Sequence, residues 1–145
     1  MAWTCQFSLF CLSHHHYNLW YSATRQACSV YLKNRLRRSY FLDPSKAAVG
    51  DQLPVLPSDR QALKSGIIPL LIASPSRPIK VQLSNALRSI ISNDFPTNWP
   101  NLLDDTKRLL NSSEIREVET GLTVLLEIVK AFRCVASSPL FICSR

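Results

Sequence analysis

The sequence predicts an all-α fold, an open array of antiparallel helix pairs, and three observations lead to this prediction. Apolar residues recur at intervals of three and four along several segments, which places them on one face of a helix. The chain has 9 prolines but only 3 glycines, which suits helices separated by proline corners and disfavours a glycine-rich phosphate loop. Nothing in these segments favours strands. We therefore expect at least five helical segments and no sheet.

The first predicted helix runs from about Ser22 to Arg38, with Ser22 as the expected N-cap. Asp43-Pro44 marks the end of this segment, and the turn residues up to Pro57 predict an exposed connection. The apolar positions of the helix lie close to helical spacing and are Ala23, Ala27, Val30, Tyr31 and Leu36.

The second predicted helix begins at Ser58, whose hydroxyl is the expected cap, and it contains Pro69, which predicts a local bend. Its apolar face consists of Leu63, Ile67, Leu70 and Leu71. After a tight turn the third helix spans about Ile79 to Asn93. Its apolar stripe is wide enough to be buried and consists of Ile79, Leu83, Ala86, Leu87, Ile90 and Ile91.

A proline-rich corner, "DFPTNWP" at residues 94–100, follows the third helix. Pro96 disfavours helical backbone at Phe95, so the helix is expected to end at or before that residue. Pro100 is well tolerated in a first helical turn, so another helix can begin there. The stretch is predicted to join two helices at a corner.

Two further helices are predicted after this corner. Residues 101–111 carry apolar residues at Leu102, Leu103, Leu109 and Leu110. The last helix is expected to be capped by Ser113. Its predicted inward face consists of Val118, Leu122, Leu125, Leu126, Val129 and Phe132.

Helical hairpins that repeat at a spacing near ~40 residues are typical of HEAT-type α-solenoids. In such an array each hairpin buries one face on its neighbours, and the second helices of the pairs form a concave surface. A closed helical bundle uses the same apolar stripes, so periodicity alone leaves both architectures open.

Composition argues against several classes of function. The five cysteines form no C-x-x-C pair, and the three adjacent histidines at residues 14–16 cannot all point at one ion on a regular helix. No stretch is long and apolar enough to span a bilayer. No nucleophile elbow, paired-carboxylate site or phosphate loop is recognisable. We therefore expect no enzyme activity, no catalytic residues, no metal and no cofactor.

Three stretches carry a resemblance to a known family: "QACSVYLKNRL", "SPSRPIKVQLSNALRSIISNDFPTNWPNLLDD" and "TGLTVLLEIVKAFR". They resemble the N-terminal region of the importin-beta (karyopherin-beta) superfamily of nuclear transport receptors, in particular the branch of importin seven and importin eight. The marks are "YLKN" at residues 31–34 and "DFPTNWPNLL" between the second and third repeats. The resemblance covers residues 22–133. Residues 1–21 and 134–145 do not share it. Residues 1–21 are expected to be an unrelated or disordered segment, and residues 134–145 an unrelated tail.

The resemblance implies a HEAT-repeat solenoid whose inner helices grip the small GTPase Ran in its GTP form, in the cytoplasm and nucleus. By this resemblance the inner helices are about Ser22–Arg38, Ile79–Asn93 and Ser113–Phe132. Polar residues opposite the apolar stripes are the candidates for this contact: Lys33, Asn34, Gln82, Asn85 and Ser89. Each of them can equally belong to a solvated helix face. The resemblance also implies that Phe95 and Trp99 wedge the repeat interface while Pro96 and Pro100 set the corner angle. Cargo proteins and nucleoporins are implied partners of a full-length relative.

A nucleic-acid-binding or scaffold module is the alternative, since the formal charge of +7 permits an acidic partner. Lys33, Arg35, Arg37 and Arg38 lie in one short basic run. These residues spread over more than one helix face, and no aromatic platform or groove-reading motif accompanies them. Nucleic acid is therefore the less favoured partner.

Overall fold

The computed structural model describes residues 19–43 and 53–136, and within them it contains five helices and no strand. The helices are α2 (Leu19–Ser39), α3 (Pro57–Ala73), α4 (Arg77–Asp94), α5 (Leu102–Leu110) and α6 (Ile115–Ala136). The predicted all-α fold is confirmed. The predicted division at residues 22 and 133 stays a prediction, because residues 1–18 and 137–145 lie outside the described part of the chain.

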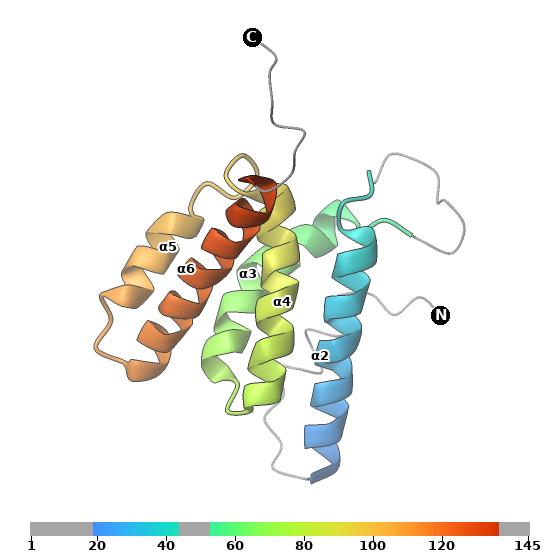
Figure 1. The fold of residues 1–145 in the computed structure, drawn as a ribbon. Helices are drawn as coiled ribbons and strands as arrows, with labels where there is room; N and C mark the ends of the chain where they lie inside the picture. The colour runs from blue at the N-terminus through green and yellow to red at the C-terminus, as the bar shows by residue number, and fades with distance from the viewer. Residues whose placement is uncertain (1–18, 44–52, 137–145) are drawn as a thin grey trace.

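The helices form two antiparallel pairs, α3 with α4 and α5 with α6, placed beside the single helix α2 (Figure 1). The three helices α2, α4 and α6 run in the same direction, and α4 contacts α2 on one side and α6 on the other. Helix α3 packs against α4 and α6, whereas α5 packs against α6. Among the described residues α2 shares no contact with α5 or α6, so the array is open rather than closed on itself.

The core is centred on α3 and α4, and their buried faces are those that the sequence predicts. All of the residues predicted for the apolar stripe of α4 are buried, and so are the four predicted for α3. Each fully buried aliphatic side chain contributes about 1.5–3 kcal/mol relative to an exposed one. No described helix has the length and apolar character needed to cross a membrane.

The predicted serine caps are wrong at all three helix starts. Helix α2 begins at Leu19, ahead of Ser22. Helix α3 begins at Pro57, so Ser58 lies in its first turn, and no side chain caps the helix. A proline at the first position needs no amide partner and has its φ preset for a helix, which makes a serine cap unnecessary there. Before α6 the hydroxyl of Ser112, not Ser113, accepts a hydrogen bond from the Glu114 amide at 3.1 Å.

The buried face of α2 also differs from the apolar pattern. Of the five apolar residues singled out, only Leu36 is buried, while Tyr31 is 42% exposed. The face instead consists of Cys28, Ser29, Leu32, Leu36, Ser39 and Tyr40. Its two serines tolerate burial because they are hydrogen-bonded: Ser29 donates to the Gln26 carbonyl at 2.7 Å and Ser39 accepts from Arg35 at 2.6 Å.

The predicted inward face of α6 is wrong. Leu122, Leu125, Leu126, Val129 and Phe132 are between 40% and 56% exposed. Helix α6 instead buries the neighbouring face, which carries Thr120, Val124, Glu127, Ile128 and Ala131. The polar members of this face have partners, since Thr120 donates to the Arg116 carbonyl at 2.8 Å and Glu127 pairs with Arg88 at 2.6 Å. Helix α6 therefore has two apolar faces, and only one of them is covered by the described chain.

Burial also differs from the prediction, to a smaller extent, in the connection before α3 and in helix α5. Val55 lies in the segment predicted to be exposed, yet it is buried in the core. Leu102 and Leu109 are buried on α5 as predicted, while Leu103 on the same helix is 49% exposed. The narrow buried side of α5 is completed by Thr106, whose hydroxyl donates to the Leu102 carbonyl at 2.7 Å.

We expect Gly121→Val to lower the free energy of unfolding by about 1–3 kcal/mol, the usual range for overpacking. Helices α5 and α6 approach closely at Gly121, where a Cβ atom would lie 3.1 Å from the Cβ of Leu109 and from side-chain atoms of Leu110. Gly121→Ala is the control. Its side chain crowds the neighbouring helix less than valine does, and its gain in helix propensity of up to about 1 kcal/mol offsets this crowding. Urea unfolding measures both variants. Equal stability of the valine variant and the parent would contradict this close approach.

Candidate protein-binding surface

The C-terminal ends of α2 and α4 are joined by a buried polar cluster. The hydroxyl of Tyr40 donates to Asp94 at 2.7 Å, and the ammonium of Lys64 lies 3.2 Å from the same carboxylate oxygen. Lys64 also donates to the carbonyl of Asn98 in the corner at 3.0 Å. Tyr40 is fully buried and Asp94 is 3% exposed. A buried charge is tolerated only when it is paired in this way, so the cluster fixes α2, α3, α4 and the corner relative to one another.

Arg60 of α3 closes the other side of this cluster. Its guanidinium donates to the carbonyls of Tyr40 at 2.6 Å, Leu42 at 2.8 Å and Val55 at 3.2 Å. It also lies 4.6 Å from the centre of the Tyr40 ring, a distance at which a cation attracts an aromatic face. One side chain thus satisfies carbonyls just beyond the end of α2, where no helical partner exists.

Charge pairs set the register between α4 and α6. Lys80 pairs with Glu119 at 3.2 Å, and Arg88 pairs with Glu127 at 2.6 Å. Both pairs join residues that are 39 positions apart, so the two helices are parallel and in step. This spacing agrees with the predicted repeat of about 40 residues.

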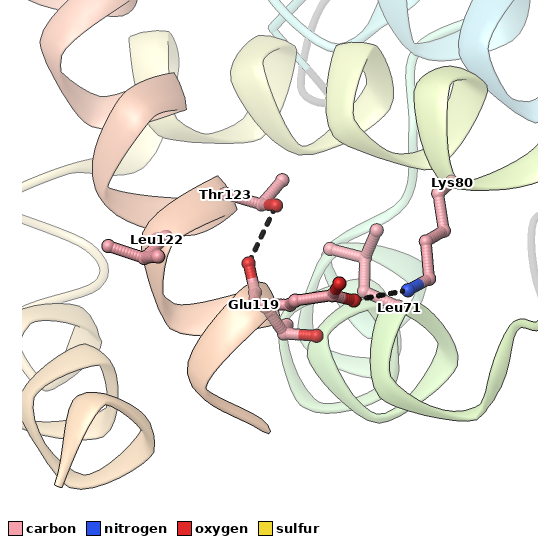
Figure 2. Close-up of a pocket in the computed structure, with 6 residues that line it drawn as sticks. Leu71, Lys80, Glu119, Leu122 and Thr123 are labelled. Atoms are coloured by element: carbon pink, nitrogen blue, oxygen red, sulfur yellow. Dashed lines mark hydrogen bonds and ion pairs between the residues drawn. The ribbon is translucent and has the colours of Figure 1, made fainter. Parts of the chain in front are cut away.

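The Lys80–Glu119 pair lies at a shallow hollow where α3, α4 and α6 meet, and Figure 2 shows the lysine reaching from α4 to the glutamate of α6. The hollow has a volume of about 280 Å³ and is lined by Leu71, Lys80, Glu119, Thr120, Leu122 and Thr123. Its two charged side chains are paired with each other, and Thr123 donates to the Glu119 carbonyl at 2.8 Å. The ion pair joins α4 to α6, and the threonine bond lies within α6.

The structure places the five candidate binding residues on two adjacent helices. Lys33 and Asn34 lie on α2, whereas Gln82, Asn85 and Ser89 succeed one another by about a turn on α4. All five are half-buried. Helices α2 and α4 pack against each other, yet no hydrogen bond or ion pair between these described residues joins one group to the other.

Within the α4 group the polar atoms differ in how well they are satisfied. The Asn85 side-chain oxygen accepts from Arg88 at 3.2 Å, and the Ser89 hydroxyl donates to the Asn85 carbonyl at 3.4 Å. The side-chain oxygen of Gln82 is buried and has no hydrogen-bond partner. A native buried acceptor without a partner is uncommon and calls for an explanation.

The corner residues are divided between the core and the surface. Trp99 is 7% exposed and belongs to the core. Phe95 is half-buried and packs against this core. The ring of Phe95 meets the ring of Phe132 on α6 edge to face, with 5.8 Å between their centres. Pro96 and Pro100 are exposed. Their role in setting the corner angle stays a prediction.

The basic run is only partly available to a ligand. Arg35 donates to the Ser39 hydroxyl at 2.6 Å and to the Pro54 carbonyl at 3.5 Å, so it ties α2 to the segment before α3. Arg37 and Arg38 are exposed, and Lys33 is half-buried. The described residues contain no cluster of three possible metal ligands. The three histidines at residues 14–16 lie outside the described part of the chain.

Sequence reasoning missed the polar contacts that build the surface. The Arg88–Glu127 and Lys80–Glu119 pairs have a signal in the sequence, since each joins a base and an acid at the same separation of 39 residues. The Tyr40–Asp94 contact spans 54 residues and has no such signal.

Comparisons with known proteins relate the chain to one group of proteins, although no protein-family model matches it. It is 33% identical over 110 residues to importin-8 of Homo sapiens, a match that covers 74% of this chain and 10% of that protein. It is also 33% identical over 112 residues to the importin alpha re-exporter of Saccharomyces cerevisiae. That match covers 77% of this chain and 11% of the yeast protein. The chain therefore spans about a tenth of the length of the curated relatives it matches.

A solved structure shares the fold. The exportin Cse1 in its cargo-free, cytoplasmic state aligns with a TM-score of 0.72 and 28% identity, over 97% of this chain and 14% of that one. Cse1 is a HEAT-repeat protein, and the likeness decides between the two architectures that periodicity left open. The fold is an α-solenoid of HEAT-type helix pairs and not a closed bundle.

Proposed function

We propose that this chain, a homologue of the importins and exportins over most of its length, binds the GTP form of the small GTPase Ran and takes part in protein import into the nucleus. Importins and exportins are nuclear transport receptors, and this supports a role in transport. Import is proposed because the sequence resembles importin seven and importin eight. A receptor of this kind shuttles between cytoplasm and nucleus, and its full-length form also takes cargo proteins and nucleoporins as partners.

The surface proposed for Ran is the inner face of α2 and α4, and the unsatisfied oxygen of Gln82 is the observation that favours it. A buried acceptor without a partner costs about 1–3 kcal/mol, and a turn of the half-buried Gln82 side chain toward a donor on a bound protein would recover this cost. Asn85 and Ser89 add further polar groups on successive turns. Lys33 on the neighbouring helix supplies a positive charge for an acid on the partner.

The rigidity of this face suits recognition of a nucleotide state. GTP orders the switch regions of a small GTPase, and their order is lost on hydrolysis. A surface held in one shape by the buried Tyr40–Asp94–Lys64 cluster needs little ordering on binding. It can therefore favour the GTP form without chemistry of its own.

We expect the full 145-residue chain to bind GTP-loaded Ran at least about tenfold more tightly than GDP-loaded Ran, a difference of about 1.4 kcal/mol. Isothermal titration or surface-based binding assays measure both forms. The double variant Lys33→Glu with Asn85→Ala should lose this preference while its helix content by circular dichroism stays unchanged.

Lys107→Glu is the matched control, because it reverses an exposed charge on the outer helix α5. It should bind as the parent does. Equal affinity of the parent for the two nucleotide states, or an equal loss in the control, would show that this face does not recognise GTP-loaded Ran.

A further inference from the structure

The guanidinium of Arg88 on α4 is held in place by a buried carboxylate of α6. Its Nε donates to Oε2 of Glu127 at 2.6 Å, and Lys130 donates to the other carboxylate oxygen, Oε1, at 2.8 Å. Glu127 is 3% exposed, and a buried charge is stable only while it stays paired. Hydrogen bonds between charged groups are also stronger than neutral ones. The guanidinium therefore has one preferred orientation.

The same guanidinium orients the side-chain amide of Asn85, which lies about one turn earlier on α4. Nη2 of Arg88 donates to Oδ1 of Asn85 at 3.2 Å. Arginine carries five N–H donors and no acceptor, so only the oxygen of the amide can face it. The oxygen and the nitrogen of a carboxamide point in different directions. The Nδ2 group of Asn85 is therefore turned away from Arg88.

The Nδ2 group of Asn85 is available to a bound protein. No described residue accepts a hydrogen bond from it, and Asn85 is only half-buried. Unlike the side-chain oxygen of Gln82, this nitrogen is not enclosed by the chain. Its two N–H groups are therefore donors that are open to solvent, on a side chain whose orientation is already set.

We propose that Glu127 and Arg88 are positioning residues that hold Asn85 as a hydrogen-bond donor, and that the bound protein meets Asn85 with an acceptor oxygen. The inference rests on the proposed binding of GTP-loaded Ran by the inner face of α2 and α4, and it adds the polarity of one contact in that face. An amide that is free to turn offers a partner either its oxygen or its nitrogen. A fixed amide offers only the donor and loses less freedom on binding.

Asn85→Asp tests whether the donor itself is used. Aspartate has nearly the same shape and pairs with Arg88 three residues along the helix, so the urea midpoint should stay the same or rise. It has no donor and sets a negative charge against the acceptor of the partner, so affinity for GTP-loaded Ran should fall at least about tenfold. Asn85→Ala removes only one hydrogen bond and should weaken binding about fivefold. Asn101→Asp is the control, because it makes the same charge change at the exposed N-cap of α5, and it should bind as the parent does.

Arg88→Lys tests the positioning step. Lysine keeps a cation for Glu127 but lacks the planar fork that also reaches Asn85. Affinity should fall about two- to fivefold, because the amide must then be ordered on binding. In the Asn85→Ala background the same substitution should cause no further loss, because it acts through Asn85. A second readout needs no Ran. The side-chain NMR signal of Asn85, identified as the one missing from Asn85→Asp, should have an order parameter below about 0.6 in the lysine variant and a higher one in the parent.

The outcomes separate this inference from the proposed function. If the parent binds GTP-loaded Ran and Asn85→Asp binds it equally well, Asn85 is not a donor to the partner, while the proposed function stands. An unchanged order parameter in Arg88→Lys, or losses that add in the double variant, would overturn the positioning role. A parent that does not bind GTP-loaded Ran would overturn the proposed function and the acceptor on the partner with it. The order parameter would then still decide whether Arg88 holds the amide.

Discussion

Replacing Trp99 with alanine should lower the free energy of unfolding by about 3–5 kcal/mol, the range for removing a buried tryptophan. Trp99 is 7% exposed and lies in the core together with the fully buried Leu102 that opens α5. The corner therefore links the α3–α4 pair to the α5–α6 pair through a large apolar side chain. Small domains are stable by only about 5–15 kcal/mol, so this loss is a large share of the total free energy of unfolding.

Urea unfolding followed by far-UV circular dichroism measures this loss. Leu103→Ala is the control, because Leu103 is 49% exposed on the same stretch of chain, and it should change stability by about 0.5 kcal/mol or less. Trp99→Phe should lie between the two, since it keeps an aromatic ring in the core. A loss at Trp99 no larger than that at Leu103 would show that the corner does not contribute to the core.

Replacing Asp94 with alanine should cost about 3–5 kcal/mol of stability, the range for breaking a buried charge pair. Asp94 is 3% exposed and Lys64 is 14% exposed, and the carboxylate also accepts from Tyr40 at 2.7 Å. The substitution leaves a half-buried ammonium and a buried hydroxyl without this acceptor. It should also loosen α2 from α4, because the cluster joins their ends.

Tyr40→Phe separates the two contacts of Asp94. It removes only the hydroxyl, and loss of a hydrogen bond to a charged group costs about 1.5–3 kcal/mol. The double variant Tyr40→Phe with Asp94→Ala should lose less stability than the two single losses added together, because both substitutions remove the same hydrogen bond. Asp104→Ala, at an exposed position in the first turn of α5, should cost less than about 1 kcal/mol. Equal effects at Asp94 and Asp104 would contradict a stabilising cluster.

The sequence predicts helices well where one face alone is apolar. The stripe of α4 is of this kind, and every residue predicted for it is buried. The four residues predicted for α3 are buried as well. Helix α6 has apolar residues on two faces, and periodicity cannot rank them. The face that the chain buries contains Glu127, which sequence reasoning excludes from a core until its partner Arg88 on α4 is known.

The candidate site shows the same limit. The inner helices α2 and α4 can be placed from apolar spacing and family resemblance, so Lys33 and Asn85 are found on neighbouring helices. The contacts that orient these helices join residues far apart in the chain, as with Tyr40 and Asp94, which are 54 positions apart. Such contacts form only when the helices are packed against one another, and no local sequence pattern predicts them.

Hydrogen exchange of the full chain with and without GTP-loaded Ran tests the central claim most directly. The account predicts slower exchange at residues 33–34 of α2 and residues 82–89 of α4 when GTP-loaded Ran is present, no change along α5, and no such protection with the GDP form. Bound proteins slow exchange by suppressing the local openings of the surface that they cover. Unchanged exchange on α2 and α4, or equal protection by the two nucleotide forms, would contradict it.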